Sequence, residues 1–310
     1  MAILGVKSLK KAKTKRGTDY YSFRGFEDGR AVDCKIWRIL GNLVDGDIIE
    51  CDYEEDHYNG VKQYKVNGYS VVECDDQAKA EIFGIEIIDT ESEVKDIEAY
   101  CKKNLKNEKY MSLLNTTIFK DGCIHEEFKT STAAKGKHHD YDGGLCHHTY
   151  CMFKICISFS NVYDLDKDLI ITGALLHDVG KIFTYKKIDN GAYDLSDNGH
   201  FFEHLTYGAM KVKDWWINLG YDEEDIDLKL LMHCILSHHG QKEWASPVEP
   251  VTQEAQLIHI ADLADSRVEM MKVGVNEYSG KEYFTDRVYP MGVSLFDRKA
   301  FDKVKGECNE

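Results

Sequence analysis

The chain has 310 residues, of which 43% are hydrophobic, and its formal net charge at pH 7 is −15. This length suits a large domain joined to a small one, and we expect two domains. No apolar run approaches the roughly 18 residues of a membrane helix, so we expect no membrane partner. The acidic balance argues against non-specific coating of nucleic acid, because phosphate contacts depend on clustered lysine and arginine.

The opening residues, Met1 to Val6, form a short apolar run that lysines follow rather than precede, which does not fit a secretory signal. We therefore expect a cytoplasmic protein. The ten cysteines include no Cys-x-x-Cys pair, which favours reduced thiols over disulfides or a zinc site. One opening segment contains no acid and is locally basic. Its basic residues are Lys7, Lys10, Lys11, Lys13, Lys15 and Arg16.

Residues 1–74 predict a small β-barrel. Short β-rich runs at 20–24, 31–37 and 47–53 alternate with turn sequences at 27–30, 45–46 and 59–60. About five such strands, with no long helix between them, indicate an OB-type barrel. Another small barrel, of SH3-like type, is the alternative from the pattern alone.

Residues 75–135 predict a helical connector, with a charged helical stretch at 91–105 and a polar segment at 130–137. From Leu145 onward apolar residues recur at helical spacing. The expected helices are at 145–159, 167–183, 200–219, 223–239 and 252–273. A hairpin is expected within 184–198, around turn residues 189–191. The second domain, 136–310, is thus predicted to be an almost entirely α-helical bundle.

Histidines and aspartates gather in the helical half in small groups. These are His147-His148, His177-Asp178, His200 with His204, His233 with His238-His239, and Asp262. A single histidine on an apolar helix is more often a hydrogen-bonded core residue than a ligand. A group drawn from successive helices, however, can converge inside a bundle, and imidazole with carboxylate suits ions such as Mn²⁺, Fe²⁺, Co²⁺ or Zn²⁺. The pattern predicts a divalent metal centre.

His177 and Asp178 are the most informative pair. Neighbouring residues on a helix point about 100° apart, so both reach one ion, or two adjacent ions, only near a helix end or a widened turn. Lys181 follows one turn later. A metal that lowers the pKa of a bound water, and a lysine that neutralises a phosphate oxygen, are suited to phosphate-ester hydrolysis.

Two sets of residues resemble known families. His148, the run LLHDVGK at 175–181 and Asp262 resemble the signature of HD-domain metal-dependent phosphohydrolases. The segments AAKGKHHDYDGGLCHHT (133–149) and ILSHHGQKEWASPV (235–248) are similar to YhaM-type 3′-to-5′ exoribonucleases. Those proteins join an N-terminal OB-fold to a C-terminal HD domain, so the resemblance covers nearly the whole chain, in outline only before residue 133.

The resemblance implies six ligands for two divalent metal ions, with Mn²⁺ expected and Fe²⁺, Co²⁺ or Ni²⁺ compatible. The ligands are His148, His177, Asp178, His204, His238 and Asp262. His204 is preferred because Gly208-Ala209 follows it as in the family, and His200, which follows a glycine, is the alternative. Asp178, Lys181 and His239 are the expected catalytic residues, with His239 contacting substrate phosphate.

For each of three neighbouring residues the sequence leaves two roles open. His147 is expected to support a ligand or to lie at the surface, and His233 to pack in the core or contact phosphate. Asp265 lies three residues after Asp262 on the same helical face, so it is expected to support a ligand or to pair with Arg267.

The function implied is a metal-dependent 3′-to-5′ exonuclease that degrades single-stranded RNA to 5′-mononucleotides, with single-stranded DNA left open. An HD-type phosphodiesterase for a small or cyclic nucleotide is the alternative, and a non-catalytic binding module with a structural metal is a third reading. Because OB-folds stack bases on aromatic side chains in a basic groove, Tyr21, Phe23, Lys35 and Trp37 are the expected nucleic-acid-binding residues, unless the aromatics fill the barrel interior. The family is compatible with a homo-oligomer.

Overall fold

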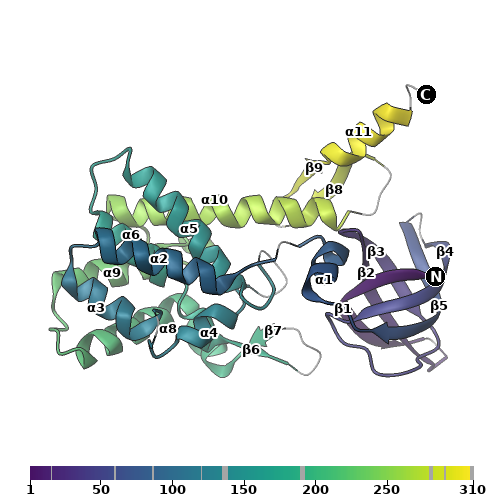
Figure 1. Cartoon of the computed structure of the whole chain (residues 1–310), viewed down its shortest axis with the longest axis horizontal. Helices are drawn as coiled ribbons and strands as arrows, with labels where there is room; N and C mark the ends of the chain where they lie inside the picture. The colour runs from purple at the N-terminus through teal and green to yellow at the C-terminus, as the bar shows by residue number, and fades with distance from the viewer. Residues whose placement is uncertain are drawn as a thin grey trace. The chain divides into compact units, whose positions relative to one another are not determined.

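The structure of the chain is a computed structural model, shown in Figure 1. It describes residues 1–14, 16–58, 61–85, 87–119, 121–134, 139–188, 193–278, 282–289 and 291–307. Lys15, the turn predicted at 59–60, residues 135–138 and the hairpin tip predicted at 189–191 lie outside the described residues. Within these ranges no helix is both long enough and apolar enough to cross a bilayer.

The chain divides into two compact units. The first comprises Met1–Ile87, Ile188–Ala192 and Met270–Glu310, and the second comprises Ile88–Lys187 and Tyr193–Glu269. These units differ from the domain bounds expected from the sequence, which were 1–74, 75–135 and 136–310. Much of the expected connector consists of helices whose apolar faces are buried in the second unit. The C-terminal residues from Met270 group with the barrel.

The barrel has five strands. They are β1 (Ala2–Lys13), β2 (Asp19–Glu27), β3 (Arg30–Ile36), β4 (Ile48–Tyr58) and β5 (Val61–Val72). Their order around the closed sheet is β1-β2-β3-β5-β4, with β4 pairing back to β1. The pairing of β3 with β5 is parallel, and the other pairings are antiparallel. Five strands closed in this non-sequential order form an OB-type barrel, which confirms the predicted fold.

The side chains of β2 alternate between the barrel core and its outer surface, as the two-residue period of a strand requires. Tyr21 and Phe23 are buried in the core, while Tyr20 and Ser22 on either side of Tyr21 are only half-buried. The turn from β2 to β3 consists of Asp28-Gly29, whose φ angles are 49° and 74°. Two residues with positive φ give the I′ type of turn, which matches the twist of a hairpin and sets its register.

Further elements complete the barrel unit. They are α1 (Asp76–Phe83), the hairpin of β8 (Phe284–Val288) with β9 (Val293–Phe296), and α11 (Arg298–Glu307). Phe83 covers Gly5, where a Cβ would lie 2.5 Å from the phenyl ring. Arg30 binds the buried Asp297 across 2.6 Å. The β8–β9 hairpin departs from the all-helical expectation, because strands of five and four residues are too short to show an alternating pattern.

The second unit is a helical bundle with one short hairpin. Its helical elements are α2 (Thr90–Asn104), α3 (Glu108–Thr117), α4 (His125–Thr130), α5 (Gly144–Ser160), α6 (Lys167–Leu176), α7 (Lys181–Thr184), α8 (Asp197–Asn218), α9 (Ile226–Ser237), the 3-10 turn η1 (Lys242–Trp244) and most of α10 (Gln253–Asn276). β6 (Tyr185–Lys187) pairs with β7 (Tyr193–Leu195) where a hairpin was expected. The expected helix at 167–183 is interrupted after α6, and this interruption positions the site.

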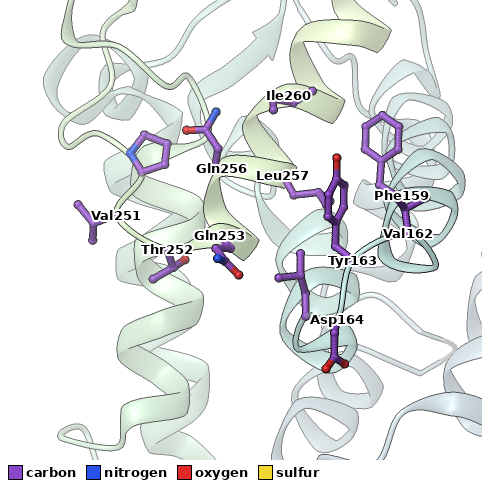
Figure 2. A pocket seen from close by; sticks show the side chains of 12 residues that line it. Phe159, Val162, Tyr163, Asp164, Val251, Thr252, Gln253, Gln256, Leu257 and Ile260 are labelled. Atoms are coloured by element: carbon purple, nitrogen blue, oxygen red, sulfur yellow. The ribbon is translucent and has the colours of Figure 1, made fainter.

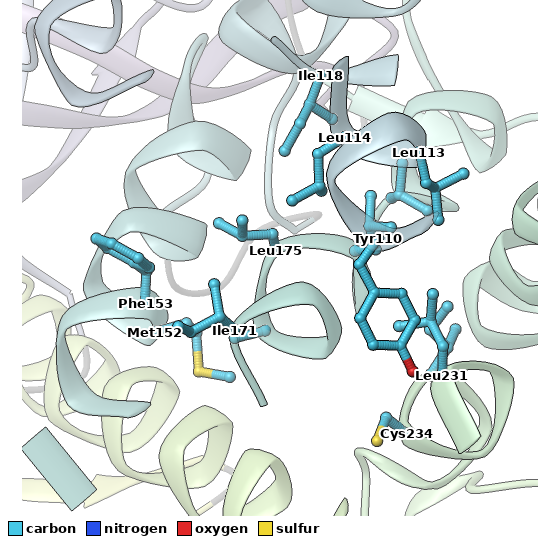
Figure 3. Close-up of a cluster of buried hydrophobic side chains, with 14 of the residues drawn as sticks. Tyr110, Leu113, Leu114, Ile118, Met152, Phe153, Ile171, Leu175, Leu231 and Cys234 are labelled. Carbon is cyan, nitrogen blue, oxygen red and sulfur yellow. The ribbon is translucent and has the colours of Figure 1, made fainter. Parts of the chain in front are cut away.

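The core of the helical unit holds these helices together. Figure 3 shows Tyr110 and Leu113 of α3, Met152 of α5, Ile171 of α6 and Leu231 of α9, all of which are buried. Full burial of a leucine, isoleucine or methionine side chain contributes about 1.5–3 kcal/mol. All nine cysteines in the described ranges are free thiols, and most are buried, as expected for small hydrophobic residues.

Candidate metal centre

The chain turns sharply between α6 and α7. His177 caps α6, and the backbone N–H of Lys181 donates to the carbonyl of Asp178 at 2.9 Å, a three-residue spacing typical of a tightened turn. Because the helix ends here, both side chains of the doublet reach the same space. His177 is 0% and Asp178 2% exposed, and His177 Nε2 lies 3.2 Å from Asp178 Oδ2.

Gly180 allows α8 to approach this turn. A Cβ on Gly180 would lie 2.0 Å from the carbonyl oxygen of His204, so any other residue would push α8 away. Glu203 has φ 57° and ψ 161°, which interrupts the helical geometry of α8 just before His204. A non-glycine residue in this conformation costs about 1–3 kcal/mol, and such strain is typical of functional sites.

His204 lies inside the cluster and His200 does not. The His204 side chain is buried, and its Nε2 lies 3.3 Å from Asp178 Oδ1. His200, one turn earlier on α8, is exposed. The structure therefore favours His204 as the ligand from α8.

The remaining predicted ligands meet around the same carboxylate. His148 of α5 places Nε2 3.1 Å from His177 Nε2 and 3.4 Å from both Asp178 Oδ2 and Asp262 Oδ1. His238, which caps α9, places Nε2 3.5 Å from Asp178 Oδ1. All six predicted ligand residues thus come together in the fold.

Two buried polar atoms in this cluster receive no hydrogen bond from any residue that the structure describes. They are Oδ1 of Asp178 and Nε2 of His204. An unsatisfied buried polar atom costs about 1–3 kcal/mol, so these atoms point to a missing partner. A divalent ion that accepts both imidazole nitrogen and carboxylate oxygen would satisfy them. The residues present therefore fit a metal ion.

The possible ligand atoms form overlapping groups. In each group the atoms lie within 4.8 Å of one another: His148 with His177 and Asp262, His177 with Asp178 and His238, His204 with His238 and His239, and His139 with His148 and Asp265. Groups that share members suit adjacent ions. His239 belongs to one of these groups, so its imidazole has the geometry of a ligand.

Asp178 and Lys181 form a buried ion pair, with Lys181 Nζ 2.5 Å from Asp178 Oδ2. Burial alone would raise the pKa of Asp178, but Lys181 and His177 hold it well below its usual range. Burial likewise opposes the charge of Lys181, yet the Asp178 carboxylate outweighs it and raises the pKa of Lys181. Both groups are therefore charged, and Lys181 holds the carboxylate in place.

The histidines of the cluster differ in their charge. Burial lowers the pKa of His177 and of His204, which keeps both rings in the neutral form that binds metals. Burial also opposes a charge on His148, but Asp178, Asp262 and a third carboxylate, Asp265, raise its pKa well above the usual range. The carboxylates around His148 therefore favour a positive charge at this side of the cluster.

His239 is held in one orientation. Burial, with the neighbouring His238 and His204, lowers the pKa of His239 to about 3. Its Nδ1 lies 2.8 Å from the carbonyl oxygen of Trp244 and must donate to it, because a carbonyl only accepts. The lone pair of the neutral ring is therefore on Nε2.

Asp265 and His139 support His148 from outside the ligand set. Asp265 Oδ2 accepts from His148 Nδ1 at 2.7 Å and from His139 Nε2 at 3.0 Å. Support of a ligand was one of the two roles expected for Asp265, and its helical spacing from Asp262 was the signal. Sequence reasoning missed His139, which lies 126 residues away in a loop.

Two other histidines contact groups outside the ligand cluster. His147 Nδ1 lies 2.6 Å from Glu93 Oε1, and His233 Nε2 accepts from the backbone N–H of Val251 at 3.0 Å. Neither residue belongs to the ligand groups among the described residues. These contacts favour a structural role for both residues, rather than metal binding or a contact to phosphate.

A pocket of about 190 Å³ opens onto the cluster. It is lined by Asp178, Lys181, His238, His239, Trp244, His259, Asp262, Leu263 and Ser266. A larger pocket, of about 800 Å³, lies between the end of α5 and the start of α10 (Figure 2). Apolar side chains such as Tyr163, Val251 and Leu257 dominate its described lining, which contains none of the six ligands. The smaller pocket is thus the one through which a substrate would reach the ligand residues.

The prediction of the nucleic-acid-binding residues on the barrel is wrong for two of them. Tyr21 and Phe23, both predicted to bind nucleic acid, are 8% and 3% exposed and pack in the barrel core, so neither presents a face to a base. Trp37 is 43% exposed, and its ring stacks on Tyr20 with centroids 4.7 Å apart. Lys35 lies on β3 and is only half-buried. Strand alternation places Tyr20, rather than Tyr21, on the outer side.

Residues 145–266 match the family model of the HD domain. This range includes all six predicted ligands, so the fold and the site define a protein with an HD domain of the metal-dependent phosphohydrolase class. The chain is a homologue of the YhaM-type 3′-5′ exoribonucleases, with an HD domain and an N-terminal β-barrel.

Three relatives named 3′-5′ exoribonuclease YhaM show the extent of the similarity. The protein of Oceanobacillus iheyensis is 26% identical over 98% of this chain and 94% of its own length. That of Bacillus pumilus is 25% identical over 96% of this chain and 93% of its own length. That of Bacillus licheniformis is 25% identical over 96% and 94%, respectively. No solved structure matches the chain.

Proposed function

We propose that the protein is a metal-dependent 3′-to-5′ exonuclease that hydrolyses single-stranded RNA to 5′-mononucleotides. The observation that carries this proposal is the buried cluster of ligand residues, in which Asp178 Oδ1 and His204 Nε2 lack partners among the described residues. The names of the relatives, which span nearly the whole chain, support RNA as the substrate class.

The proposed ligands for two divalent ions, with Mn²⁺ expected, are His148, His177, Asp178, His204, His238 and Asp262. Such ions supply an activated water and neutralise charge on the phosphate oxygens. Overlap of the ligand groups supports two ions rather than one.

The chain's own residues position the reaction. Asp178, which its ion pair with Lys181 holds in place, is the proposed acceptor of a hydrogen bond from the attacking water. His239 carries its proton on Nδ1, so its Nε2 can accept a hydrogen bond but cannot protonate the leaving 3′ oxygen. That oxygen takes its proton from solvent. Because the water oxygen bonds to phosphorus as the bond to the 3′ oxygen breaks, the released nucleotide keeps a 5′-phosphate.

The outer face of the barrel supports a single-stranded substrate. OB-folds bind single strands on the face of their second and third strands. In this chain Tyr20 of β2 and Trp37, just after β3, stack there, and Lys35 lies on β3. Base stacking on such aromatics is sequence-tolerant and applies to single-stranded DNA as well as RNA.

The test is a cleavage assay with Mn²⁺ and a 5′-labelled oligoribonucleotide. A ladder that shortens from the 3′ end, with nucleoside 5′-monophosphates as the other product, is expected. His177→Ala should abolish it, because the variant lacks a central ligand. Intact RNA in the presence of protein whose metal sites are shown to be filled would refute the proposal.

The ligand set also suits a second candidate. Asp178, Lys181 and Asp262 line the site pocket and would serve any phosphodiester, so a small or cyclic nucleotide could use the same ligands. Such a phosphodiesterase would hydrolyse cyclic dinucleotides faster than RNA, and Trp37→Ala would not alter its turnover. Parallel assays on RNA, DNA and cyclic dinucleotides decide between the two.

A further inference from the structure

An exposed tryptophan stands at the rim of the metal pocket. Trp244 ends η1, is 41% exposed and lines the pocket with His239 and Asp262. An indole offers a large flat face for contact, and tryptophan is mostly buried in folded proteins. An exposed indole next to a predicted catalytic cluster is therefore a candidate binding surface.

Hydrogen bonds to backbone groups hold the segment that carries Trp244 in place. The Trp244 carbonyl accepts from His239 Nδ1 at 2.8 Å, and its N–H donates to the Gln241 carbonyl at 3.0 Å. Beyond it, the buried Ser246 donates through Oγ to the Leu236 carbonyl at 3.2 Å. A platform that is already ordered loses little conformational entropy when a ligand binds.

The Trp244 ring also has a fixed neighbour. Its centroid lies 6.0 Å from that of His259, whose Nδ1 donates to the His238 carbonyl at 2.8 Å. His259 packs against Gly240 so closely that a Cβ on Gly240 would lie 2.2 Å from the imidazole. His259 is therefore wedged in place, and it supports part of the indole while the rest stays exposed.

The pocket is too small for a whole nucleotide. At about 190 Å³, it falls below the roughly 300 Å³ at which ligand pockets usually begin. A nucleotide whose phosphate reaches the ligand cluster must therefore leave part of itself at the rim, where Trp244 lies. Because every base has a π-face, stacking on an indole would hold any base, as an exonuclease without sequence preference requires.

We propose that Trp244 is the stacking platform for the base of the 3′-terminal nucleotide. This inference rests on the proposed exonuclease function and adds a binding subsite to it. Stacking of a base on an aromatic side chain contributes about 1–3 kcal/mol, which corresponds to about 5- to 150-fold in kcat/KM.

The test pairs protein variants with substrates that lack one base. Wild type, Trp244→Leu and Trp244→Phe are assayed on oligoribonucleotides that end in a normal nucleotide or in an abasic ribose. The kcat/KM of wild type should be about 5- to 150-fold lower on the abasic end than on the normal end, mainly through a higher KM. Trp244→Leu should show that loss on the normal end and no further loss on the abasic end. Trp244→Phe, which keeps an aromatic face, should retain most of the activity.

Controls separate stacking from damage to the site. Phe201→Leu removes another exposed aromatic of the helical unit, outside the pocket lining, and should behave like wild type. Mn²⁺ affinity, measured by calorimetry, should be unchanged in Trp244→Leu, because the contact to His239 uses the backbone carbonyl. An abasic penultimate nucleotide should change the kcat/KM of wild type and of Trp244→Leu by the same factor.

The inference is overturned if the abasic end lowers the kcat/KM of wild type and of Trp244→Leu by the same factor. It is also overturned if the effect of Trp244→Leu on kcat/KM depends on the penultimate base instead of the terminal base. It is also overturned if Trp244→Leu loses Mn²⁺ affinity together with activity. Failure of the parent proposal looks different, because wild type with filled metal sites would then leave all the oligonucleotides intact.

Discussion

Nδ1 of His148 donates a hydrogen bond to Oδ2 of Asp265 across 2.7 Å. In the neutral ring, which is the form that binds a metal, this bond places the proton on Nδ1 and leaves the Nε2 lone pair facing His177, Asp178 and Asp262. A carboxylate behind a ligating imidazole fixes its tautomer and increases its basicity. Asp265 is therefore expected to control metal binding without touching the metal.

Asp265→Ala should weaken Mn²⁺ binding about 10- to 100-fold, the range typical for loss of such a supporting carboxylate. Titration calorimetry on the folded variant measures this directly. Asp214→Asn, which removes an exposed carboxylate from α8, is the matched control and should bind Mn²⁺ like wild type. Equal affinities for Asp265→Ala and wild type would show that the hydrogen bond does not tune the ligand.

The two histidines of α8 provide a matched pair. His204→Ala should lose at least one equivalent of bound metal and most of the hydrolytic activity, because it removes a buried imidazole 3.3 Å from Asp178 Oδ1. His200→Ala, at an exposed position one turn away, should keep both. Metal content and cleavage rate are measured on both proteins. The reverse ranking would move the ligand from His204 to His200.

Removal of metal should lower thermal stability. An ion that binds only the folded chain stabilises it by about 2.7 kcal/mol at a concentration 100 times Kd. The melting temperature should therefore fall with a chelator and rise with added Mn²⁺ in wild type. In His177→Ala the melting temperature should no longer follow Mn²⁺ concentration. A steep dependence retained in that variant would place the bound ion elsewhere.

The two sides of the barrel wall should respond differently to truncation. Trp37→Ala removes the exposed partner of Tyr20 and should weaken single-stranded RNA binding by about 1–3 kcal/mol, or about 5- to 150-fold. Phe23→Ala should instead destabilise the fold by about 3–5 kcal/mol, because its ring is buried in the barrel core. Fluorescence anisotropy and urea unfolding measure the two effects. RNA affinity unchanged in Trp37→Ala would argue against this face as the binding surface.

The ion pair of Arg30 and Asp297 makes the stability of the barrel unit depend on pH. Burial alone would raise the pKa of Asp297, but Arg30 and the N–H of Ala300 hold it below its usual value. Its contribution is therefore present above the unfolded pKa of about 3.9 and is lost as the pH falls. Arg30→Met should cost about 1–2 kcal/mol at pH 7, a value reduced for the partial exposure of Arg30.

The measurement is urea unfolding of wild type and Arg30→Met at pH 7 and at pH 3. The difference between the two proteins should shrink at pH 3, where the Asp297 carboxylate begins to take up a proton. A difference that is the same at both pH values would mean that Arg30 stabilises the fold through its aliphatic packing rather than through charge.

Most elements could be predicted from the sequence, because they depend on local patterns. Alternation and turn residues indicated the barrel strands, and a helical period indicated the helices of the metal centre. The doublet His177-Asp178 could reach one ion only near a helix end or a widened turn, but the helix expected at 167–183 ran through it, and the structure ends α6 just before it. The family signature supplied the other ligands, whose convergence the structure then displayed.

Other features were decided by the tertiary structure alone. Alternation says that Tyr20 and Tyr21 face opposite sides, but only closure of the barrel decides which side is the interior. Asp265 and His139 meet across 126 residues, and no local pattern encodes such a contact. The sequence by itself thus determined most of the elements and which chemistry is available. The packing of distant segments decided which aromatic rings stay exposed and which groups hold the ligands in place.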